Sequence, residues 1–219
     1  ILYGVMTLAV ALITAGLPFA AIYLILDDGA TALSGITAGL GTLATMFAAF
    51  VVGSILSQAV WVWASKLLGK VIALAFGLMF YVLLLYALYL ALPSVNVTAI
   101  AGMFVLAGAA NGSYQQIPWA MYPDLMDVTR LQSGEAIEGA FSGIWLFGQK
   151  VANAFAPLLL SIFLASYGWR ETTEGRVEQP PEAITALLKS ITLVPGAILV
   201  VAVFALILIY KPMAAKALR

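Results

Sequence analysis

The polar side chains of one apolar segment, residues 97–122, could bind a small molecule rich in hydroxyl groups. Asn111, Tyr114, Gln115, Pro118 and Trp119 stand at i, i+3, i+4, i+7 and i+8, a spacing that places them on one helical face. Amide groups pair with hydroxyl groups, and aromatic rings cover the apolar faces of sugars. The same side chains could instead hold helices together by hydrogen bonds. Asn111, Gln115 and Trp119 are therefore candidates for contact with a solute.

A lysine lies inside the next apolar segment. Lys150 stands ~20 Å along the helix from Ile137, near or somewhat past the middle of a hydrocarbon core about 30 Å thick. A charge there costs ~2.5–3.5 kcal/mol, which makes Lys150 a candidate for substrate or cation binding together with Asn153 on the same face. Snorkelling is the alternative, and it suits span ends better. All ten acidic residues stand in loops or at helix ends, so we expect the partner of Lys150 to come from outside this chain.

Charged residues follow the segment that carries the polar stripe. We expect its helix to end near Tyr122, which would leave Asp124, Asp127 and Arg130 in a loop at the cytoplasmic end. These three residues are either part of a solvated loop or part of a charge network that locks that side in one conformational state. In the second case they would form a cytoplasmic gate.

The composition indicates a membrane protein and excludes several other classes. The chain has 219 residues, 63% hydrophobic and 9% charged, with a mean hydropathy of +1.06, whereas a soluble domain has ~25% charged residues. A net charge of zero gives no case for nucleic-acid binding. The absence of Cys and His excludes zinc sites built from those residues and His-based triads. We therefore predict neither an enzyme nor a metal site or cofactor.

Six apolar segments are long enough to cross a membrane, which takes about 20 residues. They are continuous, unlike the alternating strands of a β-barrel, so the predicted fold is an all-α, polytopic membrane bundle forming a single domain over residues 1–219. Glycines in the second and fourth segments are expected at helix contacts, and Pro181 is expected to begin a helix in the loop before the last segment. The predicted spans are 3–26, 31–63, 71–92, 97–122, 136–167 and 190–210.

Loop charges predict the orientation in the membrane. One side holds more basic residues than the other, and the richer side is expected to be cytoplasmic, with both ends of this chain on that side of an inner or plasma membrane. Because Ile1 is not Met and no charged region precedes the first apolar run, we expect Ile1 to be a cut point and not the start of a signal peptide. The richer side holds Lys66, Lys70, Arg130, Lys211, Lys216 and Arg219, and the other holds Arg170, Arg176 and Lys189.

Several ordered motifs resemble the glycoside–pentoside–hexuronide:cation symporters, the melibiose-permease group of the major facilitator superfamily. The resemblance covers all six segments and corresponds to the C-terminal half of such a transporter. The sequence departs from the family at Glu135, where basic residues are common, and at Gln115, where some sugar carriers have an aromatic residue. The matching motifs are WASKLLGK at Trp63–Lys70, PWAMYPDLMD at Pro118–Asp127, GEAIEG at Gly134–Gly139 and FGQK at Phe147–Lys150.

The resemblance implies alternating-access transport of a sugar- or glycoside-like solute, coupled to Na+ or H+, with no covalent chemistry. The cation-site acids and much of the sugar site would lie in an N-terminal six-helix half that this chain lacks, which agrees with the missing partner of Lys150. The expected partners are thus a small-molecule solute, a coupling cation, the lipid bilayer and that other half. Three alternatives remain: a carrier of lipids or other organic solutes, a non-transporting scaffold or receptor, and an intramembrane enzyme using a Ser–Lys pair.

Overall fold

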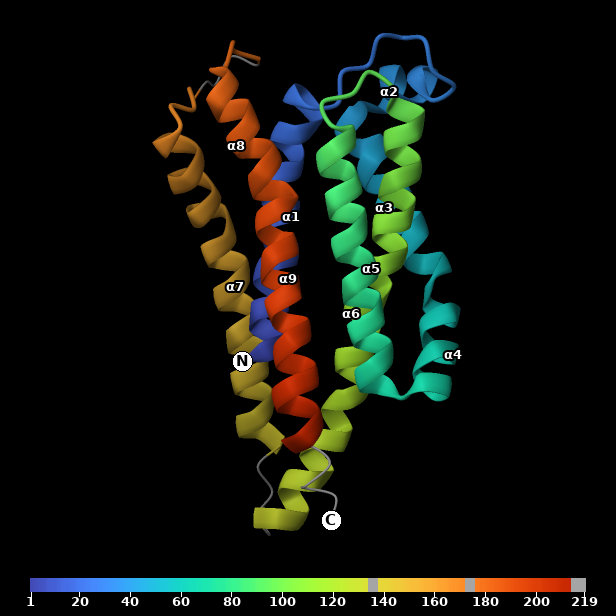
Figure 1. The fold of residues 1–219 in the computed structure, drawn as a ribbon, viewed down its shortest axis with the longest axis vertical. Coiled ribbons are helices and arrows are strands. Elements are labelled where there is room, and N and C mark those ends of the chain that lie inside the picture. Colours follow the sequence, from blue (N-terminus) through green and yellow to red (C-terminus); the bar gives the residue numbers. More distant parts are fainter. Residues whose placement is uncertain (134–137, 172–175, 214–219) are drawn as a thin grey trace.

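The computed structural model describes residues 1–133, 138–171 and 176–213, and helices dominate this part of the chain (Figure 1). Apolar runs form helices in lipid because a helix satisfies its own backbone hydrogen bonds. The helices are α1 (Leu2–Tyr23), α2 (Ser34–Leu40), α3 (Thr42–Leu56), α4 (Gln58–Leu68), α5 (Lys70–Ala91), α6 (Val97–Ser133), α7 (Glu138–Ser166), α8 (Pro181–Ile191) and α9 (Leu193–Ala205), which continues into a π-helical turn at Leu206–Tyr210.

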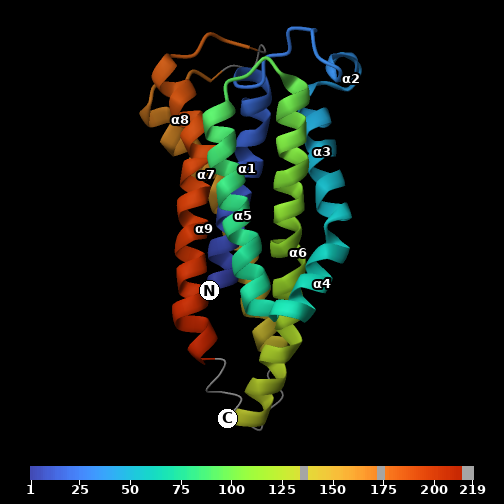
Figure 2. The same ribbon diagram turned by 45° about the vertical axis from the view of Figure 1, so that its right-hand side comes forward.

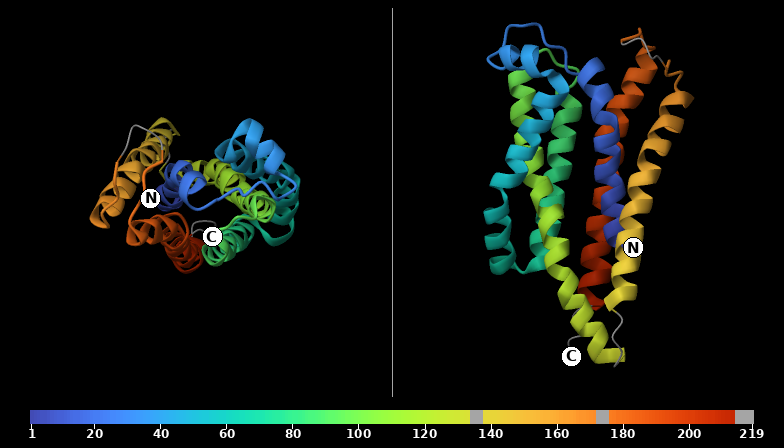
Figure 3. Two further views of the ribbon diagram at one scale, coloured as in Figure 1. Left: turned by 90° about the horizontal axis from the view of Figure 1, so that it is seen from above. Right: turned by 180° about the vertical axis from the view of Figure 1, so that it is seen from behind.

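The predicted all-α membrane bundle is confirmed. In the described residues, five helical stretches are long and apolar enough to cross a membrane, and α2 with α3 would make a sixth span. The helices form two groups. In one, α1 packs against α7 and α9; in the other, α6 packs against α3 and α5; and α5 packs against α9 to join them. Seen from behind, α1 lies between α7 and α6 (Figure 3), and a view turned by 45° shows α5 and α9 side by side (Figure 2).

The stretch predicted as one span at 31–63 is instead divided into three helices. Gly41 has a φ of 86°, and α2 meets α3 at a bend of 111°. A positive φ is open to glycine at little cost but takes the chain out of the right-handed helix, so the bend falls at this residue. As a result α2 lies across the end of the bundle (Figure 1). A second interruption at Ser57 separates α3 from α4.

The carboxylate of Asp27 holds α2 in this position. It accepts hydrogen bonds from the Ser34 hydroxyl at 2.7 Å, from the backbone N–H of Gly29 at 3.0 Å, and from the Thr37 hydroxyl. These donors stabilise the ionised form, so the pKa of Asp27 lies below its ordinary value, the Ser34 bond contributing most. Asp27 thereby connects the loop after α1 to α2.

Two helix boundaries bear on the predicted site. The α6 helix passes Tyr122 and ends at Ser133, so the expectation that Asp124 and Asp127 lie in a loop is wrong. The hydrophobic segment ends near Tyr122, but a helix that leaves the membrane keeps its backbone hydrogen bonds and continues. In contrast, α8 begins at Pro181, as predicted. Its first turn carries Glu182, whose negative charge complements the positive end of the helix dipole.

The tightest helix contact is between α3 and α6. A Cβ atom placed on Gly108 would lie 1.9 Å from the Phe50 carbonyl oxygen, and one on Gly53 would lie 1.8 Å from the Val105 carbonyl oxygen. Both glycines are therefore required by backbone approach. The prediction of helix packing is wrong for Gly35 and Gly39, because no described atom of another segment lies within 4 Å of a Cβ built there.

The loop before α8 is tied to the end of α1. The Tyr23 hydroxyl donates to the Val177 carbonyl at 3.0 Å and accepts from its N–H at 3.2 Å. The Gln179 amide makes the same kind of reciprocal pair with the Arg170 backbone, at 2.8 and 2.7 Å. The Trp169 ring stands edge-on to Tyr23 with centroids 5.2 Å apart. We call residues 169–171 and 176–180 the strap, since they fasten this loop to α1.

Candidate functional site

A groove of about 370 Å³ lies between α1, α6 and α7. The α1 residues recur every three or four positions, which brings one face of that helix to the groove. Six of the lining side chains carry hydroxyl or amide groups, an unusual density in a chain that is 63% hydrophobic. The lining residues are Thr7, Val10, Ala11, Thr14, Ala15, Tyr114, Gln115, Gln149, Asn153 and Pro157.

The threonine hydroxyls of the groove are partly engaged. Thr7 Oγ1 donates to the Tyr3 carbonyl at 2.8 Å, so its contact of 2.7 Å with Tyr114 Oη is one in which the tyrosine donates. Thr14 Oγ1 donates to the Val10 carbonyl at 3.0 Å. A threonine hydroxyl has one proton and two lone pairs, so Thr14 retains acceptor capacity toward a ligand.

The amide groups of the groove are free to form hydrogen bonds with a ligand. Gln115 and Asn153 are exposed, Gln149 is partly exposed, and within the described part of the chain none of the three makes a side-chain hydrogen bond. Each amide offers two N–H donors and one carbonyl acceptor. Donors and acceptors from α6 and α7 therefore face one space, which suits neighbouring hydroxyl groups of a small solute.

Three stacked aromatic rings begin at one side of the groove and lead away from it. Tyr3 of α1 stacks on Tyr114 of α6 with centroids 5.7 Å apart, and on Trp145 of α7 with centroids 4.1 Å apart. We call Tyr114, Tyr3 and Trp145 the aromatic stack. Tyr114 lines the groove, whereas Tyr3 and Trp145 line a separate apolar cavity of about 320 Å³. The aromatic stack therefore stands between the groove and this cavity.

The structure brings together only part of the predicted solute site. Gln115 and Asn153 line the groove. Trp119 packs edge-on against Tyr3 at a centroid distance of 6.2 Å and is outside the groove lining. Asn111 is buried at 2% exposure, and its Oδ1 has no hydrogen-bond partner among the described residues.

Lys150 lies beside the groove on the exposed surface of α7, next to Gln149. No described carboxylate lies within ion-pair distance of its ammonium group. The expectation that its partner comes from elsewhere stays a prediction.

Sequence reasoning missed Thr7, Thr14 and Gln149. The two threonines stand seven residues apart, two helical turns, in an otherwise apolar segment. That spacing would have placed them on one face of α1. Gln149 is part of the FGQK motif, in which the charge of Lys150 is the stronger signal because charges are rare inside membrane spans.

Asp124, at the end of the predicted fourth span, forms an ion pair with a residue of another helix. Lys70 Nζ lies 2.6 Å from Asp124 Oδ2 and also donates to the Ala120 carbonyl at 2.9 Å, which joins the start of α5 to α6. Asp127 and Arg130 lie farther along the same helix in exposed positions. Because Lys70 and Asp124 are exposed, a pair of this kind contributes only about 0–1 kcal/mol. Lys216, Arg219 and Glu135, named from the sequence, are outside the described residues.

The described residues hold no group of three or more His, Cys, Asp or Glu side chains that could bind a metal ion. A family model described as MFS/sugar transport protein matches residues 34–211. The chain is also 27% identical over 139 residues to an uncharacterized symporter of Synechocystis sp., a match that covers 63% of this chain and 25% of that protein. The chain thus spans about a quarter of the length of this relative.

Proposed function

The chain belongs to the MFS/sugar transport family, and we propose that it forms one half of a cation-coupled secondary transporter whose solute binds in the groove. The observation that carries this proposal is the convergence of hydroxyl and amide groups from three helices on one exposed space. Transporters of this superfamily place their substrate between two related halves near the membrane midplane. The groove is open on the surface of this chain, where a second half would cover it.

The proposed solute is sugar- or glycoside-like. Gln115 and Gln149 approach the groove from different helices, so each amide can pair with a different hydroxyl group of one solute. A site built to pair with hydroxyl groups rejects analogues that lack them, because its buried polar groups would be left without partners. The Tyr114 ring, which Tyr3 supports from behind, gives the groove an aromatic surface against which the carbon face of a sugar ring can pack.

Transport would proceed by alternating access, as the two halves rock about the bound solute. We assign Lys150 to coupling with Na+ or H+, since a compact ammonium beside the groove can respond to acids of the other half. The pair of Lys70 with Asp124, together with Asp127 and Arg130, would form the cytoplasmic gate. In this proposal the protein lies in an inner or plasma membrane. Both ends of the chain face the cytoplasm, as the loop charges predict.

Uptake by the full-length transporter in proteoliposomes tests the proposal. A panel of sugars is offered with an inward Na+ gradient, an inward H+ gradient or neither. Gln149→Ala should raise the half-saturating concentration of the transported sugar at least tenfold. The matched control is Gln58→Ala, because the Gln58 amide bonds to the Ser54 carbonyl of its own segment, outside the groove. Gradient-independent uptake, or equal effects of the two substitutions, would contradict the proposal.

A further inference from the structure

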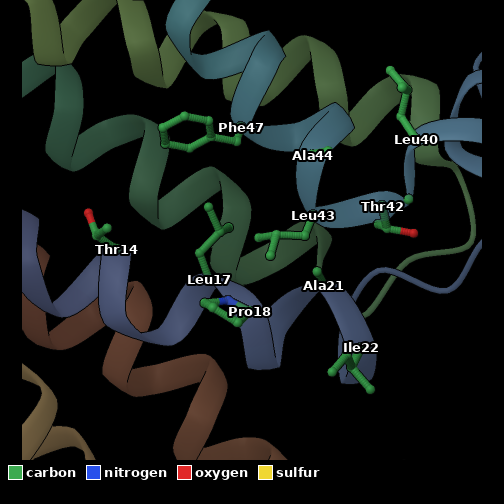
Figure 4. Close-up of a pocket in the computed structure, with 11 residues that line it drawn as sticks. Thr14, Leu17, Pro18, Ala21, Ile22, Leu40, Thr42, Leu43, Ala44 and Phe47 are labelled. Carbon is green, nitrogen blue, oxygen red and sulfur yellow. The ribbon is translucent and has the colours of Figure 1, made fainter. Parts of the chain in front are cut away.

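A third space, of about 710 Å³, lies where α2 meets α3. Its side chains come from α1 and from the residues around the Gly41 bend (Figure 4). Leu17 and Pro18 of α1 lie across from Leu43 and Phe47 of α3 in this view. Apart from Thr14 and Thr42, every side chain in the lining is apolar. We call this space the apolar pocket.

The apolar pocket adjoins the groove at Thr14. Thr14 lines both spaces, and the lining residues of α1 follow one another at helical spacing along a single face. That face is polar at Thr7 and Thr14 and apolar from Leu17 to Ile22. Thr14 and Ile22 are eight residues apart, ~12 Å along the helix. A ligand in the groove could therefore extend past Thr14 into apolar surroundings without leaving this face.

We propose that the apolar pocket is a subsite for an apolar substituent of the solute, which makes the solute an amphiphilic glycoside with a hydroxyl-rich head. This inference rests on the proposed function. The head would pair with the amides of the groove, and a ring or short alkyl group would lie among Leu17, Leu43 and Phe47. Each buried methylene-sized group should tighten binding about fourfold.

The Gly41 bend makes the subsite possible. The bend of 111° turns α2 away from the axis of α3, and Leu40, Gly41 and Leu43 at the bend line the pocket. An acyl chain from the bilayer is another possible occupant. The shared residue Thr14 favours the solute, because an acyl chain that enters from the bilayer would leave the hydroxyl and amide groups of the groove without partners.

Labelling of single cysteines tests the inference, since the chain has no native Cys. The full-length transporter in membrane vesicles, with any cysteine outside this chain replaced by serine, would carry one of three substitutions. Leu43→Cys reports on the apolar pocket, Ala15→Cys on the groove, and Lys66→Cys, at the exposed end of α4 and outside both linings, is the control. The probes are glucose, galactose, xylose and glucuronic acid, their p-nitrophenyl glycosides, and p-nitrophenol alone.

The expected result is that one glycoside slows maleimide labelling of both Leu43→Cys and Ala15→Cys. It should act at a concentration at least tenfold lower than its free sugar, which should protect only Ala15→Cys. Protection of Ala15→Cys by free sugar with no glycoside protecting Leu43→Cys would overturn the inference and leave the proposed function standing. Protection of neither cysteine would reject both. Two other outcomes would also overturn the inference, because they would mean that something else occupies the pocket. One is protection of Leu43→Cys by p-nitrophenol as strong as that by the glycoside, and the other is a Leu43→Cys that never reacts with maleimide.

A second measurement does not depend on the cysteine variants. Ala44→Phe should fill the apolar pocket, whereas Ala48→Phe places the same ring on α3 outside its lining. The ratio of glycoside affinity to free-sugar affinity should fall at least tenfold in Ala44→Phe and stay unchanged in Ala48→Phe. Equal ratios in the two variants would overturn the inference.

Discussion

Thr7 of α1 and Tyr114 of α6 share a hydrogen bond of 2.7 Å in which the tyrosine hydroxyl is the donor. Both residues are buried, and their contact connects the two groups of helices beside the groove. The direction of the bond matters because Thr7 uses its own proton on the Tyr3 carbonyl. Loss of either partner therefore has a different cost.

Substitution of these two residues should be asymmetric. Thr7→Val leaves the Tyr114 hydroxyl buried without a partner and should lower the free energy of unfolding by about 1–3 kcal/mol. Tyr114→Phe removes the donor and leaves Thr7 bonded to Tyr3, so it should cost about 0.5–1.5 kcal/mol. Denaturant unfolding in detergent measures both, with Thr14→Val as the control because its hydroxyl bonds within α1. A larger cost for Tyr114→Phe would contradict this hydrogen-bond direction.

The contact of α3 with α6 should tolerate no side chain at Gly108. Gly108→Ala sets a methyl group against the Phe50 backbone, and overpacking of this kind costs about 1–3 kcal/mol or more. Gly102→Ala is the matched control on the same helix, where no described atom of another segment lies within 4 Å. That change should be neutral or stabilise by about 0.5–1 kcal/mol, as alanine does in a helix. Melting temperatures in detergent compare them, and similar values would refute the close approach.

Lys150 should be needed for coupling and not for folding. In the full-length transporter, Lys150→Ala should abolish ion-driven accumulation while the amount of folded protein in the membrane stays near wild type. Lys150→Arg should abolish ion-driven accumulation too, because the wide, planar guanidinium group of arginine does not replace a compact ammonium group. Lys66→Ala, at the exposed end of α4, is the control. Near-wild-type accumulation by Lys150→Ala, normalised to folded protein, would reject the assignment.

The hold of Asp27 on α2 should depend on pH. Its pKa is lowered below 3.8 in the folded protein, so the stabilisation is fully present above the ordinary pKa and is lost as the pH falls through the lowered value. Asp27→Asn should melt at a lower temperature than wild type at pH 7, because a neutral amide is a weaker acceptor for three donors. The two melting temperatures should converge below the lowered pKa. A difference in melting temperature that stays constant with pH would argue against a stabilising role of the ionised Asp27 carboxylate.

The orientation predicted from loop charges can be checked with one cysteine. Ser65→Cys, at the end of α4, should react with an impermeant maleimide only after the membrane is opened. Thr98→Cys, at the opposite end of the bundle near α2, should react in intact cells. The reverse pattern would invert the proposed topology. The outer position Gly175 and the inner position Ala215, which suggest themselves from the sequence, are outside the described residues.

The sequence predicted what depends on local patterns. Apolar runs identified the helical bundle, and Pro181 marked the start of α8. The division of 31–63 was missed because a glycine permits a positive φ without requiring it, so the apolar pattern alone could not place the bend at Gly41. Helical spacing put Gln115 and Trp119 on one helical face, but it could not tell that Gln115 would line the groove while Trp119 packs against Tyr3. That outcome depends on which helix lies opposite.

The strap connects the surface of the protein at the end of α1 to the helix that lines the groove. Tyr23 ends the same helix that carries Thr7 and Thr14, and its hydroxyl is bonded in both directions to Val177. A tilt of α1 about the solute would therefore move the strap as well, because two hydrogen bonds join Tyr23 to Val177. An antibody fragment raised against the strap would recognise one tilt better than the other. In the transport cycle proposed above, such a reagent would hold the transporter at one stage.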